Sequence, residues 1–234
     1  MKRIMSLILV LIMIFVCGPS ALALEKTQSP QRQIEAAIRS IDEAELRRDA
    51  LNNVVDPTVP ESVRNSFKVI AELNVEDPTY ENPYEIGEVY STVKRVGEID
   101  CGNGKTGTMY VATSAVEVKE DNGFGSNLGA KVWSSVYWID NLGVDNELYA
   151  VDATWDASNC DYETGEKTIR YGKVALSTMV FFDSTLVEVP DSVTDKYIYC
   201  HGEYTGYSFA CKAQMRVGPS PVTVTSWAIT SLVA

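Results

Sequence analysis

Four cysteines carry the most specific chemistry that this sequence offers, at Cys101, Cys160, Cys200 and Cys211. The fifth cysteine, Cys17, lies in the expected signal peptide. An even number of cysteines in an exported chain favours two disulfides, for which three pairings exist. A tight turn at Thr205-Gly206 would join two strands and place Cys200 opposite Cys211, close enough for a cross-strand bridge. Cys101 and Cys160 would then bond each other or remain free thiols.

The N-terminus predicts export through a signal peptide that covers Met1–Ala23. Met1-Lys2-Arg3 is basic, Ile4–Val16 is an apolar run, and Ala21-Leu22-Ala23 has the small-x-small pattern of a signal-peptidase site. The run is shorter than the roughly 20 residues that cross a bilayer, so cleavage after Ala23 is expected. The alternative is an uncleaved N-terminal anchor.

The chain expected after cleavage is strongly acidic, with 18 Lys and Arg against 32 Asp and Glu, a net charge of −14. Nucleic acids and anionic membrane surfaces are bound through basic side chains. The composition therefore predicts no nucleic-acid partner and no stable membrane insertion after cleavage. It leaves an extracellular protein or a cell surface as the partner, without identifying it.

No pattern in the sequence predicts a metal or a cofactor. A single histidine and the lack of paired C-x-x-C motifs disfavour zinc. The oxygen-rich segment Asp156–Glu166 lacks the spacing of an EF-hand loop and is interpreted as a solvated acidic loop. Asp152 and Asp156 could form a glycosidase-type pair of carboxylates, but no second signature of that chemistry accompanies them.

The elements expected to position these residues are N-terminal helices followed by an antiparallel sheet, which is an α+β fold. Ser29-Pro30 predicts the start of a helix that runs to about Leu51, and Thr58–Glu61 fits a capping box that starts a second. Apolar residues at helical spacing predict a third helix over Tyr84–Val96. We divide the chain into a signal peptide (1–23), a helical segment (24–57) and one domain (58–234) that ends in a β-hairpin extension.

A hairpin over Lys131–Asp156 is predicted at the centre of the domain. Lys131–Ile139 and Leu148–Trp155 are rich in β-prone residues, and a polar turn joins them. Asp152 lies near the end of the second strand, in the run Val151–Asp156. The hairpin tryptophans could line a ligand groove, although alternation places some of them in the core: Trp133, Trp138 and Trp155. Further strands are expected over Thr168–Val174, Thr178–Phe182, Thr185–Val189, Lys196–His201, Tyr207–Gln214 and Val222–Val233.

A helix, then Cys101, then a hairpin whose second strand reads Tyr149–Asp156 is a pattern that resembles the transglutaminase-like superfamily. The resemblance covers roughly residues 63–156. Members of that family place a nucleophilic cysteine at the start of a helix, a histidine on one strand and an aspartate on the next. The resemblance implies a cysteine-protease-like core with Cys101 at the nucleophile position and Asp152 as the orienting carboxylate. Lys131 occupies the position of the histidine.

The missing histidine decides what the resemblance implies about activity. A thiol with an ordinary pKa of about 8.5 is mostly protonated at neutral pH and needs a neighbouring base. A lysine is a poor proton shuttle, and the only histidine, His201, adjoins Cys200 in the expected cysteine hairpin. The resemblance therefore implies a secreted, catalytically degenerate domain with a structural or binding role, in which Cys101 bonds Cys160.

Two alternatives remain open. An active cysteine hydrolase or acyltransferase would use Cys101 and Asp152 with an unconventional base, and it requires a free thiol at Cys101. The other alternative is an unrelated secreted α+β binding module, which is favoured if Cys101, Lys131 and Asp152 do not share one cleft.

Overall fold

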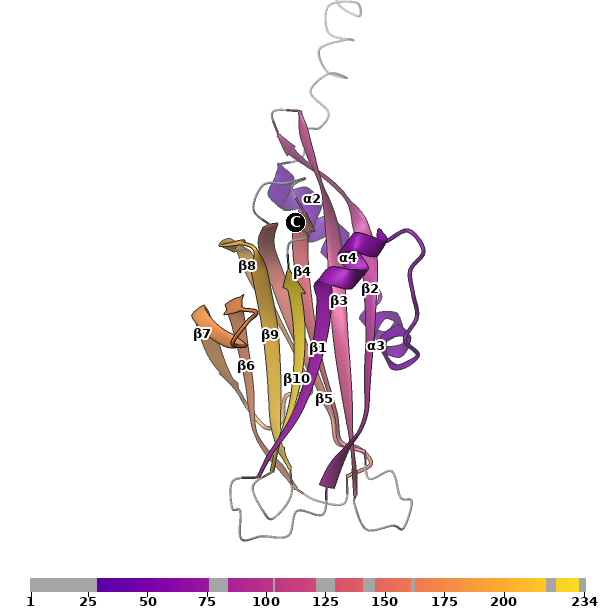
Figure 1. Cartoon of the computed structure of the whole chain (residues 1–234), viewed down its shortest axis with the longest axis vertical. Helices are drawn as coiled ribbons and strands as arrows, with labels where there is room; N and C mark the ends of the chain where they lie inside the picture. The colour runs from indigo at the N-terminus through magenta and orange to yellow at the C-terminus, as the bar shows by residue number, and fades with distance from the viewer. Residues whose placement is uncertain are drawn as a thin grey trace, which may run out of the picture.

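The computed structural model describes residues 29–75, 84–102, 104–120, 129–140, 146–160, 163–217 and 222–231. Within these ranges, ten β-strands form two five-stranded antiparallel sheets and three short helices accompany them (Figure 1). The structure is therefore mostly β, and the predicted α+β fold with a transglutaminase-like core is wrong. The predicted signal peptide Met1–Ala23 lies outside the described residues. No helix in the described ranges is long and apolar enough to cross a bilayer.

The first sheet, which we call the central sheet, has the order β2-β3-β4-β5-β8. Its strands are β2 (Tyr84–Gly102), β3 (Lys105–Glu120), β4 (Lys131–Asp140), β5 (Asn146–Asp156) and β8 (Asp195–Gly206). The second, the outer sheet, has the order β1-β10-β9-β6-β7. Its strands are β1 (Phe67–Val75), β6 (Thr164–Ala175), β7 (Val180–Val189), β9 (Ser208–Val217) and β10 (Val222–Ser231).

The two sheets pack face to face because alternate residues of their strands are apolar. The core between them holds Trp138 and Trp155 from the central sheet against Phe209 and Met215 from the outer sheet, all with almost no exposed surface. Burying one such side chain stabilises the fold by about 1.5–3 kcal/mol. The sheets therefore form a β-sandwich with its strands along the long axis of the molecule (Figure 1).

Two helices cover the other face of the central sheet. They are α2 (Pro30–Arg39) and α3 (Glu43–Leu51). Ile34, Ile38 and Leu46 pack against residues of β2–β5 such as Met109 and Tyr137. The central sheet is therefore buried on both faces, which explains why every residue of β4 except its two ends is buried.

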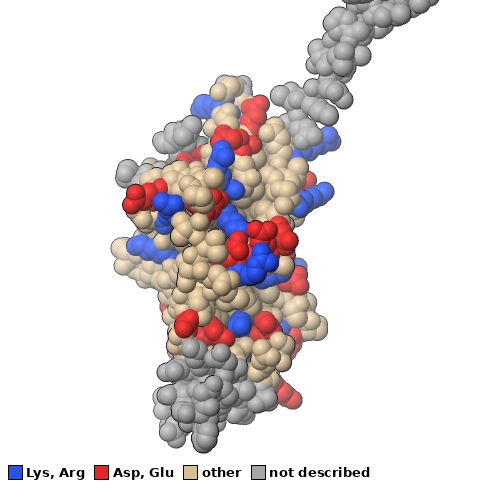
Figure 2. All heavy atoms as spheres, turned by 90° about the vertical axis from the view of Figure 1, so that its right-hand side faces the viewer, with Lys and Arg blue, Asp and Glu red and all other residues tan. Residues whose placement is uncertain are grey.

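Basic and acidic side chains are interspersed on the side of the molecule shown in Figure 2. On α3, for example, Glu45 and Asp49 both form ion pairs with Lys94 of β2. Exposed pairs of this kind contribute at most about 1 kcal/mol each. This side therefore presents no continuous patch of one charge.

The N-terminal helix prediction was partly confirmed. A helix does start at Ser29-Pro30, but the segment forms two helices, and the Asp42 carboxylate caps the second by accepting a hydrogen bond from the Glu45 amide at 3.0 Å. The Thr58 hydroxyl donates to Asp56 and does not cap a helix. The only helix there is α4 (Glu61–Ser66), which passes directly into β1.

The helix predicted over Tyr84–Val96 is wrong, because this segment is β2. Its β-branched residues favour a strand, and it pairs with β3 along most of its length. Register shifts at Ile86/Glu88 and at Arg95/Gly97 interrupt the alternation of the strand. Apolar residues on either side of a β-bulge therefore fell at helical spacing by coincidence.

The central hairpin was predicted correctly. β4 and β5 are antiparallel neighbours, with Lys131 opposite Asp156 and Ser135 opposite Asp152. The expected cysteine hairpin does not form, because β8 pairs with β5 in the central sheet and β9 pairs with β6 and β10 in the outer sheet.

Candidate functional site

The three residues at the positions of a transglutaminase-like site do not share one cleft. Cys101 and Tyr149 both pack on the apolar cluster under the helices. Lys131 lies at the other end of β4, opposite Asp156. Tyr149 and Asp156 are seven residues apart on β5, which corresponds to roughly 24 Å. Asp152 lies between these two positions, so Cys101 and Lys131 flank it from opposite ends of the sheet.

The surroundings of Cys101 do not activate its thiol. Burial raises the pKa of Cys101, and the carboxylates of Glu147 and Asp100 raise it further, while a backbone hydrogen bond from Gly107 opposes them. A catalytic thiol needs the opposite change, a lowered pKa beside a base or a cation. The geometry around Cys101 is therefore that of a structural cysteine.

The predicted Cys101–Cys160 bridge is incompatible with the positions of the two residues. Cys101 packs on the helix side of the central sheet, whereas Cys160 follows the far end of β5 and packs against the core between the sheets. A disulfide needs Cα atoms within about 7 Å of each other. Cys200 and Cys211 both belong to the core between the sheets, and none of the four described cysteines forms a disulfide in the structure. A Cys200–Cys211 bridge, now between sheets rather than within a hairpin, stays a prediction.

Alkylation of the native protein should label Cys101 and Cys160 slowly and should leave Cys200 and Cys211 unlabelled until the protein unfolds. Burial raises the pKa of Cys200 to about 12 and the pKa of Cys211 well above its ordinary value. Peptide mapping by mass spectrometry before and after denaturation measures this order. Labelling of Cys101 faster than a free cysteine would contradict it. Failure to label Cys200 and Cys211 in denaturant without a reductant would show that they are bridged.

A row of buried polar side chains crosses the helix side of the central sheet. Thr113, Ser135 and Asp152 lie opposite one another on β3, β4 and β5. The Thr113 and Ser135 hydroxyls are 2.9 Å apart, and the Ser135 hydroxyl donates to the Asp152 carboxylate at 3.1 Å. Because Ser135 donates to Asp152, Thr113 is the donor to Ser135, and one chain of hydrogen bonds joins three strands.

The Asp152 carboxylate is only 3% exposed. Burial raises the pKa of Asp152 to about 7, and the Glu43 carboxylate on α3 adds to this, while the Ser135 hydrogen bond and the Arg47 guanidinium oppose it. Arg47 does not pair with Asp152, because it donates to Thr154 at 3.0 Å and forms an ion pair with Glu43 at 3.6 Å. Asp152 is therefore a weakly compensated buried acid.

Asp152 does not line the hollows of the described surface on the outer sheet, along α2 or beside the end of β7. Tyr137 and Tyr197 lie beside it, with ring centroids 5.5 Å apart, and the Tyr197 hydroxyl is buried without a hydrogen-bond partner. A general acid or base must reach the proton that it transfers. The row thus joins strands under α3 and offers no access to a substrate.

The other residues singled out in the sequence have structural surroundings. The His201 side chain is exposed, stacks on Tyr199 at 5.5 Å, and lies 3.4 Å from Gln31 of α2 through its Nδ1 atom. All three hairpin tryptophans, and not only some of them, are buried: Trp133, Trp138 and Trp155 are at most 5% exposed and line no open groove.

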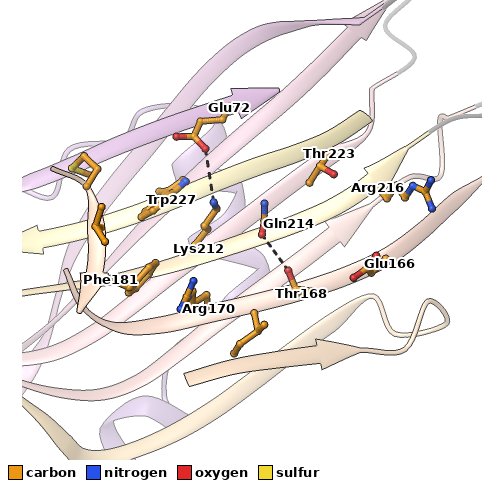
Figure 3. A pocket seen from close by; sticks show the side chains of 13 residues that line it. Glu72, Glu166, Thr168, Arg170, Phe181, Lys212, Gln214, Arg216, Thr223 and Trp227 are labelled. Carbon is orange, nitrogen blue, oxygen red and sulfur yellow. Dashed lines mark hydrogen bonds and ion pairs between the residues drawn. The ribbon is translucent and has the colours of Figure 1, made fainter. Parts of the chain in front are cut away.

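The structure does place a fourth tryptophan at a hollow, on the outer sheet (Figure 3). The hollow has a volume of about 630 Å³, within the range of small-molecule sites. β10, β9 and β6 form its floor, and the start of β7 with the residue before it forms one wall. Its lining is aromatic, cationic, amide and hydroxyl in character: Trp227, Phe181, Lys212, Arg170, Arg216, Gln214, Thr168, Thr223, Glu72, Glu166, Met179, Val180 and Leu186.

Two aromatic rings and two cations are stacked in this hollow. The Phe181 and Trp227 rings are 5.4 Å apart and 18° from parallel. The Lys212 ammonium lies 4.6 Å from the centre of the Trp227 ring, and the Arg170 guanidinium lies 5.4 Å from that of Phe181. Cation–π contacts of this kind contribute about 0.5–2 kcal/mol each.

The charge of the hollow differs in sign from the charge of the chain. Three basic and two acidic side chains line it, whereas the whole sequence has a net charge of −12. Burial lowers the pKa of Lys212 and the nearby Arg170 lowers it further, although Glu72, 3.9 Å away, opposes both. The Lys212 ammonium is therefore only partly neutralised by Glu72.

The hydrogen-bonding capacity of the hollow is also incomplete. Gln214 accepts from Thr168 at 3.4 Å and donates to Thr225 at 3.0 Å. Trp227 is only 5% exposed, yet its indole N–H has no hydrogen-bond partner. Leaving a buried donor unpaired costs about 1–3 kcal/mol, so an acceptor that reaches this N–H would remove that cost.

Sequence reasoning missed this site because its residues come from five strands that are scattered along the chain. One signal was present: Lys212, Gln214 and Arg216 alternate with apolar residues along β9. That alternation predicts a strand with one polar face. It does not reveal that Trp227 and Phe181 lie on the same face.

The fold and the hollow together define a class of protein: a β-sandwich with helices on one outer face and an open, aromatic and cationic hollow on the other. No family model, no curated protein and no solved structure matches this chain. The function is therefore argued from the site itself.

Proposed function

We propose that this protein is an exported, non-catalytic binding module whose ligand lies in the hollow of the outer sheet. The observation that carries this proposal is the Trp227 indole N–H, which is buried without a hydrogen-bond partner. It lies in the same hollow as the Lys212 ammonium, which Glu72 only partly neutralises, and the Arg170 guanidinium. Polar groups that converge beside aromatic rings in a recess are typical of ligand sites. Export rests on the signal predicted in Met1–Ala23, and it would present the hollow to an extracellular partner or surface.

The enzyme alternative has less support from the geometry. It needs Cys101 as a nucleophile beside a base, but burial raises the pKa of Cys101. Asp152 is buried under α3, and Lys131 forms an ion pair with Glu117 at 3.5 Å, with no contact to Asp152. A binding role requires none of these three residues.

Filling the hollow tests the proposal independently of the charge of the ligand. Thr168→Trp places a large side chain in the hollow at a strand position that tolerates aromatic residues. Lys68→Trp is the matched control, because Lys68 is exposed on β1 of the same sheet but does not line the hollow. Both variants are compared with the original protein against neutral saccharides, acidic saccharides, amino acids and small carboxylates, by ligand-observed NMR and calorimetry.

We expect at least one of these ligand classes to bind the original protein. Thr168→Trp should weaken that binding by about tenfold or more, which is about 1.4 kcal/mol, whereas Lys68→Trp should leave it unchanged. If a folded Thr168→Trp variant binds the ligand as tightly as the original protein does, the binding site lies outside the hollow. Binding of no class would remove the proposal.

A further inference from the structure

We propose that the ligand group held in the hollow is a carboxylate, which displaces Glu72 from Lys212 and accepts a hydrogen bond from the Trp227 indole. This inference rests on the proposed function and specifies the chemistry of its ligand. Among the described residues, Glu72 has the only carboxylate that contacts Lys212. Glu72 is 3.9 Å from the ammonium, and its side chain is 40% exposed. That distance is at the limit of an ion pair, so Glu72 is a weak partner that a ligand can replace.

The donors around Lys212 match one oxyanion. Figure 3 shows the indole nitrogen of Trp227 on the side of the ring toward Lys212 and Glu72, with Arg170 on the far side of Lys212. The indole N–H has no acceptor, and the Lys212 ammonium retains donor capacity beyond its single long contact with Glu72. A carboxylate carries two acceptor oxygens and can serve both donors at once.

The balance of charges favours one negative charge over two. Burial lowers the pKa of Lys212, and repulsion from Arg170 adds to this while Glu72 opposes it. A single carboxylate relieves that repulsion. A dianion would in addition face the carboxylates of Glu72 and Glu166, which also line the hollow.

Hydroxyl and amide groups beside the cations indicate what the rest of the ligand carries. Gln214 follows Lys212 on the same face of β9, Thr168 lies opposite Gln214 on β6, and Thr223 lies farther along the floor, opposite Arg216 (Figure 3). These hydroxyl and amide side chains both donate and accept hydrogen bonds, as the hydroxyls of a sugar require. A uronic acid combines a carboxylate with such hydroxyls, so it is the ligand class that fits the whole lining.

The Trp227 indole resonance reports on this site directly. The chain has four tryptophans, so a ¹⁵N-labelled sample gives four indole N–H signals, and Trp227→Phe identifies the one from Trp227. The protein is titrated with glucuronate, acetate, glucose and inorganic phosphate. Glucuronate and acetate should shift the Trp227 signal downfield, with glucuronate binding more tightly. Glucose should not shift it, and phosphate should bind more weakly than glucuronate.

Three variants separate the roles of the charges. Lys212→Met keeps the apolar stem over Trp227 and should lose about tenfold or more in glucuronate affinity. Glu72→Gln removes the competing carboxylate and should raise that affinity up to about fivefold. Lys68→Met is the control and should change nothing.

The outcomes distinguish this inference from the proposed function. If glucose shifts the Trp227 signal as strongly as glucuronate does, the hollow is a binding site but its ligand needs no carboxylate. Tighter binding of phosphate than of glucuronate also overturns the carboxylate assignment. If glucuronate shifts other signals but not the Trp227 signal, glucuronate binds outside the hollow. That result contradicts both proposals for this ligand.

Discussion

Asp152→Asn should raise the free energy of unfolding by about 4 kcal/mol at pH 8 and should change it little at pH 4. The buried carboxylate has a pKa of about 7 in the folded protein, against 3.8 for an ordinary aspartate. Between pH 3.8 and pH 7, the folded state therefore binds about one more proton than the unfolded state. Stability must fall as the pH rises through this window, and above pH 7 the full cost remains.

Asparagine mimics the protonated carboxyl, because it has one acceptor for Ser135 and donors on the other atom. The variant should therefore lack this fall in stability. Denaturant unfolding from pH 4 to pH 8 measures the free energy of unfolding of the variant and of the original protein, and the difference between the two is compared across this range. Asp183→Asn is the control, because Asp183 is a half-exposed carboxylate that pairs with Lys173 on the outer sheet. A difference for Asp152→Asn that does not depend on pH would show that the carboxylate is compensated.

Gly172→Ala should destabilise the protein by about 3 kcal/mol or more, which lowers the melting temperature by roughly 6–12 °C. Gly172 has a φ of +140°, which side-chain-bearing residues rarely adopt. A Cβ atom there would lie 2.3 Å from the Asp183 carbonyl oxygen and 2.7 Å from the Ser184 Cα atom, both of them backbone atoms of β7. The strand must therefore move away from β6.

Gly165→Ala is the matched control on the same strand. Its added Cβ would have only the Arg216 Cδ atom within reach, at 4.0 Å, and its φ lies outside the positive region. We expect its stability to stay within about 1 kcal/mol of the original protein. Thermal unfolding by circular dichroism compares the two variants. An equal loss of stability in the two variants would show that β7 can move away from β6 without a measurable loss of free energy. Because β7 also carries Phe181, Gly172→Ala should in addition weaken ligand binding in the hollow.

The elements that sequence predicted well are those whose signals are local. The hairpin of β4 and β5 has two β-prone runs and a polar turn within 26 residues, Lys131–Asp156, so its pairing needed no distant information. β2 failed for the opposite reason: its bulges depend on how it pairs with β3, and they shifted its apolar residues to a helical spacing. The β-branched residues of this segment favoured a strand, but the helical spacing of its apolar residues was misleading.

The candidate site was harder to predict than the fold. Asp152 was singled out from the sequence, and in the structure it is a buried acid that shares no cleft with Cys101 and Lys131. The hollow depends on which face of each strand points outward and on which strands become neighbours. Trp227 and Phe181 are 46 positions apart in the chain, yet their rings stack. No local pattern encodes such a contact.

The position of β10 in the outer sheet has a consequence for the order in which the chain can fold. β10 lies between β1 and β9, and β1 has no other neighbour in its sheet. Phe67 of β1 pairs with Thr230 of β10, across 163 positions of the chain. Contacts of such large sequence separation form late and slowly. During synthesis, β1 leaves the ribosome long before β10 exists, so the outer sheet can close only after β10 has been made. An outer sheet that stays open until β10 arrives is compatible with translocation of the chain in an unfolded state.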